Sequence, residues 1–310
     1  MKKVFCALLL LLCCAAGARA DLRARFGDLV KADPPGHRAA PRSGVRITYL
    51  GTNGYLLESG DTVILVDPYF SRMSLLRCSL KMRTKAEPEL VDRWLAGVPR
   101  IDGVLVTHGH IDHLFDVPQV LNRRPRATLY APETSIHLAR GAGVPARQAH
   151  VVRPGDILRI GSATVRVQHA SHDRLLGSIP FPGPATHYPP VNVNDWICGE
   201  TLAYLIEIGG KRIYLAGGSA VDDRPSAGLG RIDLAIQGAA TPDATVALPA
   251  VLQRLRPAKV LPSHMDDFFR PLDRGFSFLA MTDFPKVQKI VREERSELIL
   301  LDYFQPWTLR

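Results

Sequence analysis

This 310-residue sequence has few cysteines, and it lacks blocks of consecutive lysines or arginines and internal repeats. Nothing in the charge pattern therefore indicates nucleic-acid binding, and no period predicts a solenoid. Three of the 5 cysteines lie within the first 14 residues, which leaves Cys78 and Cys198. Neither lies near a ligand motif in the sequence. In an oxidising compartment the two could pair or remain separate thiols, and both readings stay open.

The marked apolar run, Val4 to Ala16, is shorter than the roughly 20 residues that cross a bilayer. Lys2 and Lys3 precede it, and Ala18-Arg19-Ala20 follows as a small-x-small cleavage site. This order predicts a secretory signal peptide over residues 1–20, and hence export to the periplasm or the medium. A membrane helix, or lipid attachment at Cys13 or Cys14, is the alternative.

Removal of residues 1–20 takes away Lys2, Lys3 and Arg19, so 39 − 3 = 36 basic residues face 30 acidic ones, a net charge of +6. A moderately basic chain fits an anionic substrate or an anionic surface, although net charge does not define identity.

The rest of the chain predicts an N-terminal arm over 21–44, loose or ordered on contact, and an α/β layered domain over 45–310. Three short strand-like runs, 45–50, 55–58 and 63–66, are separated by turn formers and predict an antiparallel meander. Further on, apolar periodicity predicts alternating elements. Helices are expected at 88–96, 117–122, 133–141, 246–256 and 285–295, and strands at 101–106, 127–131, 164–168, 202–208, 212–215, 232–236, 259–261 and 298–301.

The run Thr107-His108-Gly109-His110-Ile111-Asp112-His113 follows the predicted strand 101–106 directly. Three imidazoles and a carboxylate within six residues are ligands that suit Zn²⁺ and its first-row neighbours. Packing alone gives no reason to gather four such side chains at a strand end. The motif therefore predicts a metal site.

This His-x-His-x-Asp-His string resembles the defining motif of the metallo-β-lactamase-fold hydrolases, which implies a four-layer αββα sandwich. Three further segments resemble the branch that contains N-acyl-phosphatidylethanolamine phospholipase D and ascorbate-phosphate lactonase relatives. They are Gly51-Thr52-Asn53-Gly54, Asp67-Pro68-Tyr69-Phe70 and the segment from His264 to Phe269.

The resemblance implies a Zn²⁺ site at His108, His110 and a third imidazole, for which His172 is expected and His169 is the fallback. It implies a second site at Asp112, His113 and His264, and it places Asp67 behind a ligand imidazole, where its carboxylate fixes the tautomer. Relatives carry a metal-bridging aspartate where this chain has Gly218, so one or two ions are expected. His137 and His150 are expected to be structural or solvent-facing.

Zinc held in this way supplies hydroxide at neutral pH, with Asp112 and His113 as catalytic side chains. The predicted reaction is hydrolysis of an ester-like bond, a phosphodiester or a lactone, in a small-molecule or lipid-like substrate. Contact with a membrane surface fits that substrate, and the oligomeric state is left open. The proline-rich connection 174–199 is expected to cover the metal cleft or to form plain surface. The alternative function is a metal-binding, weakly catalytic or non-catalytic protein that lost the carboxylate at Gly218.

Overall fold

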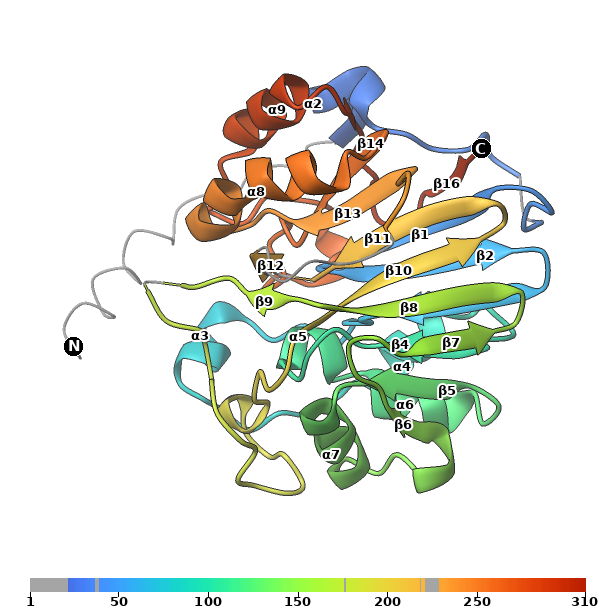
Figure 1. Cartoon of the computed structure of the whole chain (residues 1–310). Coiled ribbons are helices and arrows are strands. Elements are labelled where there is room, and N and C mark those ends of the chain that lie inside the picture. The colour runs from blue at the N-terminus through green and yellow to red at the C-terminus, as the bar shows by residue number, and fades with distance from the viewer. Residues whose placement is uncertain (1–21, 37–38, 176, 218, 221–228) are drawn as a thin grey trace.

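Two seven-stranded sheets stack face to face, and helices cover the outer face of each (Figure 1). The computed structural model describes residues 22–310 apart from 37–38, 176, 218 and 221–228. The predicted signal peptide and Gly218 therefore lie outside the described residues. Within them the predicted four-layer αββα sandwich is confirmed.

The first sheet has the strand order β16-β1-β2-β3-β4-β5-β6. The predicted meander forms its antiparallel half, and β3 to β6 continue it as parallel strands. Outside it lie the helices α4 (Pro88–Trp94), α6 (Val117–Arg123) and α7 (Glu133–Gly141). The strands are β1 (Val45–Gly51), β2 (Gly54–Ser59), β3 (Thr62–Val66), β4 (Gly103–Leu105), β5 (Thr128–Ala131), β6 (Ala149–Val151) and β16 (Pro306–Leu309).

The second sheet has the order β15-β14-β13-β11-β10-β8-β7, and the predicted hairpin around Gly209-Gly210 joins β10 to β11. Its outer face carries α8 (Pro242–Leu255) and α9 (Phe284–Glu293). Thr241 and Asp283 cap these helices by accepting hydrogen bonds from Ala244 N and Lys286 N. The strands are β7 (Ile157–Ile160), β8 (Ala163–His169), β10 (Leu202–Ile208), β11 (Lys211–Ala216), β13 (Leu234–Gly238), β14 (Lys259–Ser263) and β15 (Glu297–Leu298).

The largest apolar core lies between the two sheets and extends under α4, α6 and α7. Strands such as β3 and β13 are buried almost along their whole length, which explains why their sequences are continuous apolar runs and do not alternate. A second cluster joins α8 and α9 to the described part of the N-terminal arm.

Where the structure describes it, the arm packs against the domain. It forms the helix α2 (Leu22–Phe26) and a 3₁₀ turn (Gly27–Leu29), and Leu22 and Val30 are buried against the second cluster. Val30 also bridges to Leu300. The sequence predicted neither α2 nor the edge strands β7 and β16, because segments of four or five residues are too short to show a period.

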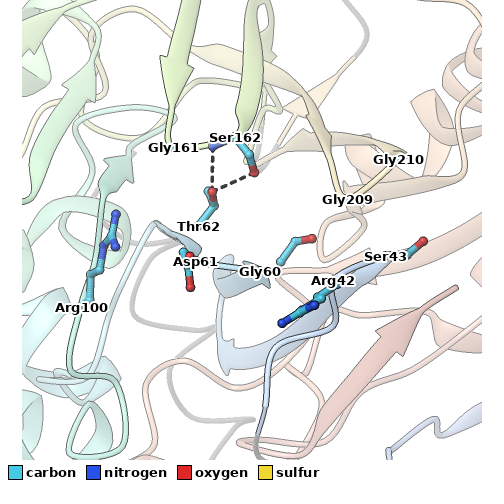
Figure 2. A pocket seen from close by; sticks show the side chains of 11 residues that line it. Arg42, Ser43, Gly60, Asp61, Thr62, Arg100, Gly161, Ser162, Gly209 and Gly210 are labelled. Carbon is cyan, nitrogen blue, oxygen red and sulfur yellow. Dashed lines mark hydrogen bonds between the residues drawn. The ribbon is translucent and has the colours of Figure 1, made fainter.

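An open hollow of about 610 Å³ lies at the hairpin ends of the strands, and no residue of the motif loop lines it. Figure 2 shows the residues that do. There Thr62 Oγ1 accepts a hydrogen bond from Ser162 N at 2.8 Å and lies 2.9 Å from Ser162 Oγ, which joins the two sheets. The backbone N of Gly44 adds a bond to Gly209 O at 2.8 Å. These bonds hold the two sheets together at the hairpin ends, and the motif loop lies at the other end of the sandwich.

None of the helices in the described part of the chain combines the length and the apolar character that a membrane span requires.

Candidate metal centre

The motif loop leaves β4 and enters the short helix α5 (Ile111–Leu114), so its side chains gather at one end of the sandwich. Gly109 lies against the end of the long connection that precedes β10, and its N donates to Cys198 O at 2.9 Å. A Cβ at Gly109 would lie 2.3 Å from Ile197 O. Glycine in the motif is therefore required by close packing with that connection.

The first ligand cluster consists of His108, His110, His172 and Cys198, whose ligand atoms all lie within 4.8 Å of one another. His172 comes from β9 (Ser171–His172), a two-residue strand that pairs with β12 (Ser219–Ala220) beyond the end of β8. Its ring centroid lies 4.8 Å from that of His108 and 4.7 Å from that of His110. The alternative ligand, His169, is exposed and is not part of the cluster.

Backbone carbonyls orient two of these imidazoles. His110 Nε2 lies 2.8 Å from Pro180 O, and His172 Nδ1 lies 2.7 Å from Asp173 O. A ring nitrogen can only donate to a carbonyl oxygen, so His110 Nδ1 and His172 Nε2 are left as lone-pair donors to a metal. His110 Nδ1 in turn lies 2.9 Å from His108 Nε2.

The second cluster consists of Asp112, His113 and His264, again within 4.8 Å. His264 Nε2 lies 3.3 Å from His113 Nε2 and 3.0 Å from Asp112 Oδ2. The third edge, from His113 Nε2 to Asp112 Oδ2, measures 3.6 Å. His264 follows β14 of the second sheet, whereas the other two ligands belong to α5.

The protonation states of the two clusters differ. Burial, together with the neighbouring imidazoles, lowers the pKa of His110 to about 3 and holds the pKa values of His108 and His172 below their ordinary value. In the second cluster burial opposes charge, yet His113 and His264 hold the pKa of Asp112 well below its usual range. The hydrogen bond and charge of Asp112 raise the pKa of His264 to about 9 against the effect of burial. Without an ion, the imidazoles of the first cluster are therefore neutral at pH 7, whereas Asp112 and His264 of the second carry opposite charges; His264 would release its proton to bind a metal.

Asp67 lies behind the clusters as the resemblance implied. Its Oδ2 lies 2.8 Å from His113 Nδ1 and accepts hydrogen bonds from Asn53 Nδ2 and Thr107 Oγ1, both at 2.7 Å. Its Oδ1 accepts from Thr107 N at 2.8 Å. Asp67 therefore orients His113 so that Nε2 points toward the second cluster. A Cβ at Gly217 would lie 2.6 Å from Asn53 Nδ2, so this network also requires glycine at that position.

A buried ion pair that the sequence did not reveal holds the strand end that carries His264. Asp266 accepts hydrogen bonds from Arg72 Nη2 at 2.6 Å, Tyr303 Oη at 2.5 Å, Tyr49 Oη at 2.7 Å and Thr52 N at 2.8 Å. The side chains of Arg72 and Asp266 are 1% and 0% exposed. These bonds fix the segment two residues after His264 against the first sheet.

Three residues near the clusters have left-handed backbones although none is glycine. They are Thr52 (φ 57°), Asp67 (φ 39°) and His264 (φ 60°). His264 N donates to Thr52 O at 2.8 Å, so two of these strained residues hold each other. Such conformations cost about 1–3 kcal/mol each and persist where surrounding contacts fix them. Sequence patterns carry no direct sign of them, because the residues are ordinary.

The connection between β9 and β10 lies over the first cluster. Pro180 O contacts His110 Nε2, and the ring centroids of Phe181 and His110 lie 6.4 Å apart. Trp196 is buried against Phe115. Its second half pairs with the segment after α3 (Leu75–Ser79), through Thr84 N and Val191 O at 2.8 Å. The structure therefore favours the prediction that the connection covers the metal cleft over the alternative that it is plain surface. His137 and His150 are exposed, as expected.

Cys78 and Cys198 are separate thiols, so of the two alternatives the structure has the unpaired one and no disulfide joins them. Cys198 nevertheless lies in the first cluster, although no motif in the sequence surrounds it. The hydrogen bond between Gly109 and Cys198 crosses 89 positions of the chain, which explains why sequence proximity missed it.

The residues present fit zinc. A tetrahedral zinc ion with imidazole ligands at about 2.0–2.1 Å separates its ligand atoms by roughly 3.3 Å. The three edges of the second cluster, 3.0, 3.3 and 3.6 Å, surround that value. Neutral imidazoles, a carboxylate and a thiol are also donors that zinc accepts.

Stacked sheets with these ligand clusters at one end define a protein of the metallo-β-lactamase fold. The solved structure of Igni18, a metallo hydrolase from the archaeon Ignicoccus hospitalis, superposes with a TM-score of 0.60 at 16% identity, over 86% of this chain and 99% of that one. The family described as the β-lactamase superfamily domain matches residues 62–266, and the chain belongs to it.

Two curated relatives are informative. A UPF0173 metal-dependent hydrolase from Desulforamulus reducens is 26% identical over 71% of this chain and 84% of its own length. A probable L-ascorbate-6-phosphate lactonase from Escherichia coli is 27% identical, but the match covers 45% of this chain and 39% of the lactonase.

Proposed function

We propose that this metallo-hydrolase cleaves an ester-like bond, in a phosphodiester or a lactone, with zinc as its metal. The observation that carries the proposal is the pair of ligand clusters, His108/His110/His172 and Asp112/His113/His264, side by side at one end of the sandwich. The names of the relatives, a metal-dependent hydrolase and a probable lactonase, support the reaction class.

Zinc bound by these side chains would lower the pKa of water and polarise a carbonyl or phosphoryl oxygen. Asp67 holds the proton of His113 at Nδ1, and the carbonyls of Pro180 and Asp173 hold those of His110 and His172. In a chain that holds an ion in the first cluster alone, the Asp112 carboxylate and the His264 imidazole, 3.0 Å apart, would accept and donate a proton beside the reacting atoms. Phe181 and the buried part of the connection exclude water from one side.

The surroundings of the site favour a lipid-like substrate. A surface patch on and after α3, next to the covering connection, combines exposed apolar and basic side chains: Leu76, Arg77, Leu80, Lys81, Met82 and Arg83. The three apolar side chains are 58%, 64% and 43% exposed, which is unusual for neighbouring large apolar residues. Apolar insertion combined with positive charge is how peripheral proteins bind anionic lipid surfaces.

The reaction is tested on the full chain reconstituted with zinc, with bis-p-nitrophenyl phosphate, a simple ester and a lactone as substrates. We expect zinc-dependent turnover of at least one, lost in His110→Ala and retained in His169→Ala. Bound zinc without turnover of any of them would instead favour the alternative, a binding protein in which the loss of the carboxylate at Gly218 ended catalysis.

The lipid part needs a separate test. Leu76→Ser should weaken sedimentation with phosphatidylglycerol vesicles, whereas Ile157→Ser should not, because Ile157 is equally exposed (56%) but lies on the edge strand β7. Equal sedimentation of both variants would remove the membrane from the proposal and leave a small soluble substrate.

A further inference from the structure

Cys198 occupies a place in the first cluster that the motif does not explain. Its Sγ lies within 4.8 Å of the ligand atoms of His108, His110 and His172. Its side chain is buried, and its hydrogen-bond partner among the described residues, Thr201 Oγ1, is 3.7 Å away. A thiol is a weak donor and a weak acceptor, so this contact does not account for its position.

Two backbone hydrogen bonds fix this thiol. Gly109 N donates to Cys198 O at 2.9 Å, and Cys198 N donates to Phe181 O at 3.0 Å. Gly109 belongs to the ligand motif itself, and a Cβ there would push the Ile197 carbonyl away. The absence of that Cβ is thus what lets the cysteine approach the two motif histidines.

We propose that Cys198 Sγ is a thiolate ligand of the ion that His108, His110 and His172 hold, which gives the first site a three-histidine, one-cysteine donor set. This inference rests on the metal site of the proposed function and adds a ligand to it. Without an ion, burial raises the pKa of the Cys198 thiol to about 11, so the thiol is protonated at pH 7. Coordination therefore replaces the S–H bond by a sulfur–metal bond and releases one proton to solvent.

The thiolate has two consequences for the site. First, it supplies a negative charge to a cluster of neutral imidazoles. Second, a soft sulfur ligand favours zinc over manganese or magnesium, which prefer oxygen ligands. The inference predicts a first site that is tight and selective for zinc. Four protein ligands leave no open tetrahedral position there, so the water of the proposed reaction would be bound by an ion in the second cluster.

The experiment uses the full chain loaded with one equivalent of Co²⁺, in the native form and in the variants Cys198→Ser and Cys78→Ser. Cys78 is the matched control because its Sγ, 3.8 Å from Met73 O, lies outside both ligand clusters. The cysteines of residues 1–20 are the same in all forms. We expect a thiolate-to-cobalt charge-transfer band in the near ultraviolet for the native chain and Cys78→Ser, and its loss in Cys198→Ser.

Zinc gives two further measurements, and the first of them needs no folded Cys198 variant. X-ray absorption of Cys78→Ser with one equivalent of zinc should show one sulfur at about 2.3 Å. Cys198→Ser should bind zinc more weakly by on the order of 100-fold, since even the loss of groups behind the ligands costs 10–100-fold. Stoichiometric metal without the charge-transfer band and without zinc–sulfur scattering would overturn the inference.

The two proposals fail separately. A charge-transfer band in a protein that hydrolyses none of the test substrates would leave Cys198 as a ligand and refute the proposed reaction. Zinc-dependent turnover without any sulfur ligand would do the reverse.

Discussion

His264 Nε2 lies 3.0 Å from Asp112 Oδ2, although 152 positions of the chain separate the two residues. Asp112 is the second residue of the helix α5, which comes after β4 of the first sheet, and His264 follows β14 of the second. Their charges depend on each other: Asp112 is ionised, and the pKa of His264 is raised to about 9. The second cluster is therefore formed by the packing of the two sheets against each other.

His172→Ala should remove the ion of the first cluster, because it takes away an oriented Nε2 lone pair. His169→Ala should leave metal content unchanged, since His169 is exposed and lies at the end of β8, outside the ligand cluster. Calorimetric titration with zinc, checked by elemental analysis, measures both. Loss of metal in His169→Ala alone would show that the two histidines exchange roles.

Asp67→Asn should weaken the binding of an ion to the second cluster by roughly 10–100-fold. An amide cannot accept hydrogen bonds from His113, Asn53 and Thr107 together. Asparagine tolerates the left-handed backbone at this position, so the fold should survive. Zinc titration gives the affinity, and Asp61→Asn in the exposed turn after β2 is the control. Unchanged affinity in Asp67→Asn would mean that His113 is held by other contacts.

Arg72→Met should lower the free energy of unfolding by about 3–5 kcal/mol, because it leaves the buried Asp266 carboxylate without its cation. The matched control is Arg153→Met, since Arg153 pairs with Glu133 at the surface with a side chain that is 66% exposed. That change should stay within about 0.5 kcal/mol. Urea denaturation of the metal-free proteins compares them, and equal effects would contradict a structural role for the buried pair.

Asp116 should make stability depend on pH. Its buried carboxyl accepts hydrogen bonds from Phe70 N, Ser71 N and Ser71 Oγ, yet burial raises its pKa to about 6. The folded state therefore binds this proton more tightly than the unfolded chain does. The stabilisation it gives is complete below the unfolded pKa, near 4, and is lost as pH rises through about 6.

Between pH 7 and pH 5, the native chain should gain about 1 kcal/mol of unfolding free energy relative to Asp116→Asn. The measurement is the difference between the two proteins at each pH, so other titrating groups cancel to a first approximation. A constant difference would mean that the three donors keep Asp116 ionised throughout.

The family resemblance implied the sandwich, and the motif that carries this resemblance is local and dense. The motif 107–113 lies within one loop, and the strands of the core are nearly continuous apolar runs. Helix α7 and strand β10 have the predicted bounds, since glycine ends both. The sequence did not predict the edge strand β16, because it is short, begins with Pro306 and is defined mainly by its pairing with β1.

The parts of the site that sequence could not reveal depend on contacts between distant segments. Cys198 joins the first cluster through Gly109, and Asp266 meets Arg72 across 194 positions. The left-handed backbones of Thr52, Asp67 and His264 are likewise set by their surroundings. An isolated cysteine, an arginine after a strand and an aspartate in a loop are common residues, so only folding shows what they do.

Both ligand clusters combine side chains from the two halves of the sandwich. In the first cluster, His108 and His110 come from the first half and His172 from the second. In the second cluster, Asp112 and His113 come from the first half and His264 from the second. An ion in either cluster would therefore act as a cross-link between the halves. Folding and metal uptake would be thermodynamically linked, because the unfolded chain has no such assembled site. Supply of the metal would then set how long the chain survives proteases, and a chelator would shorten that lifetime before any substrate is involved.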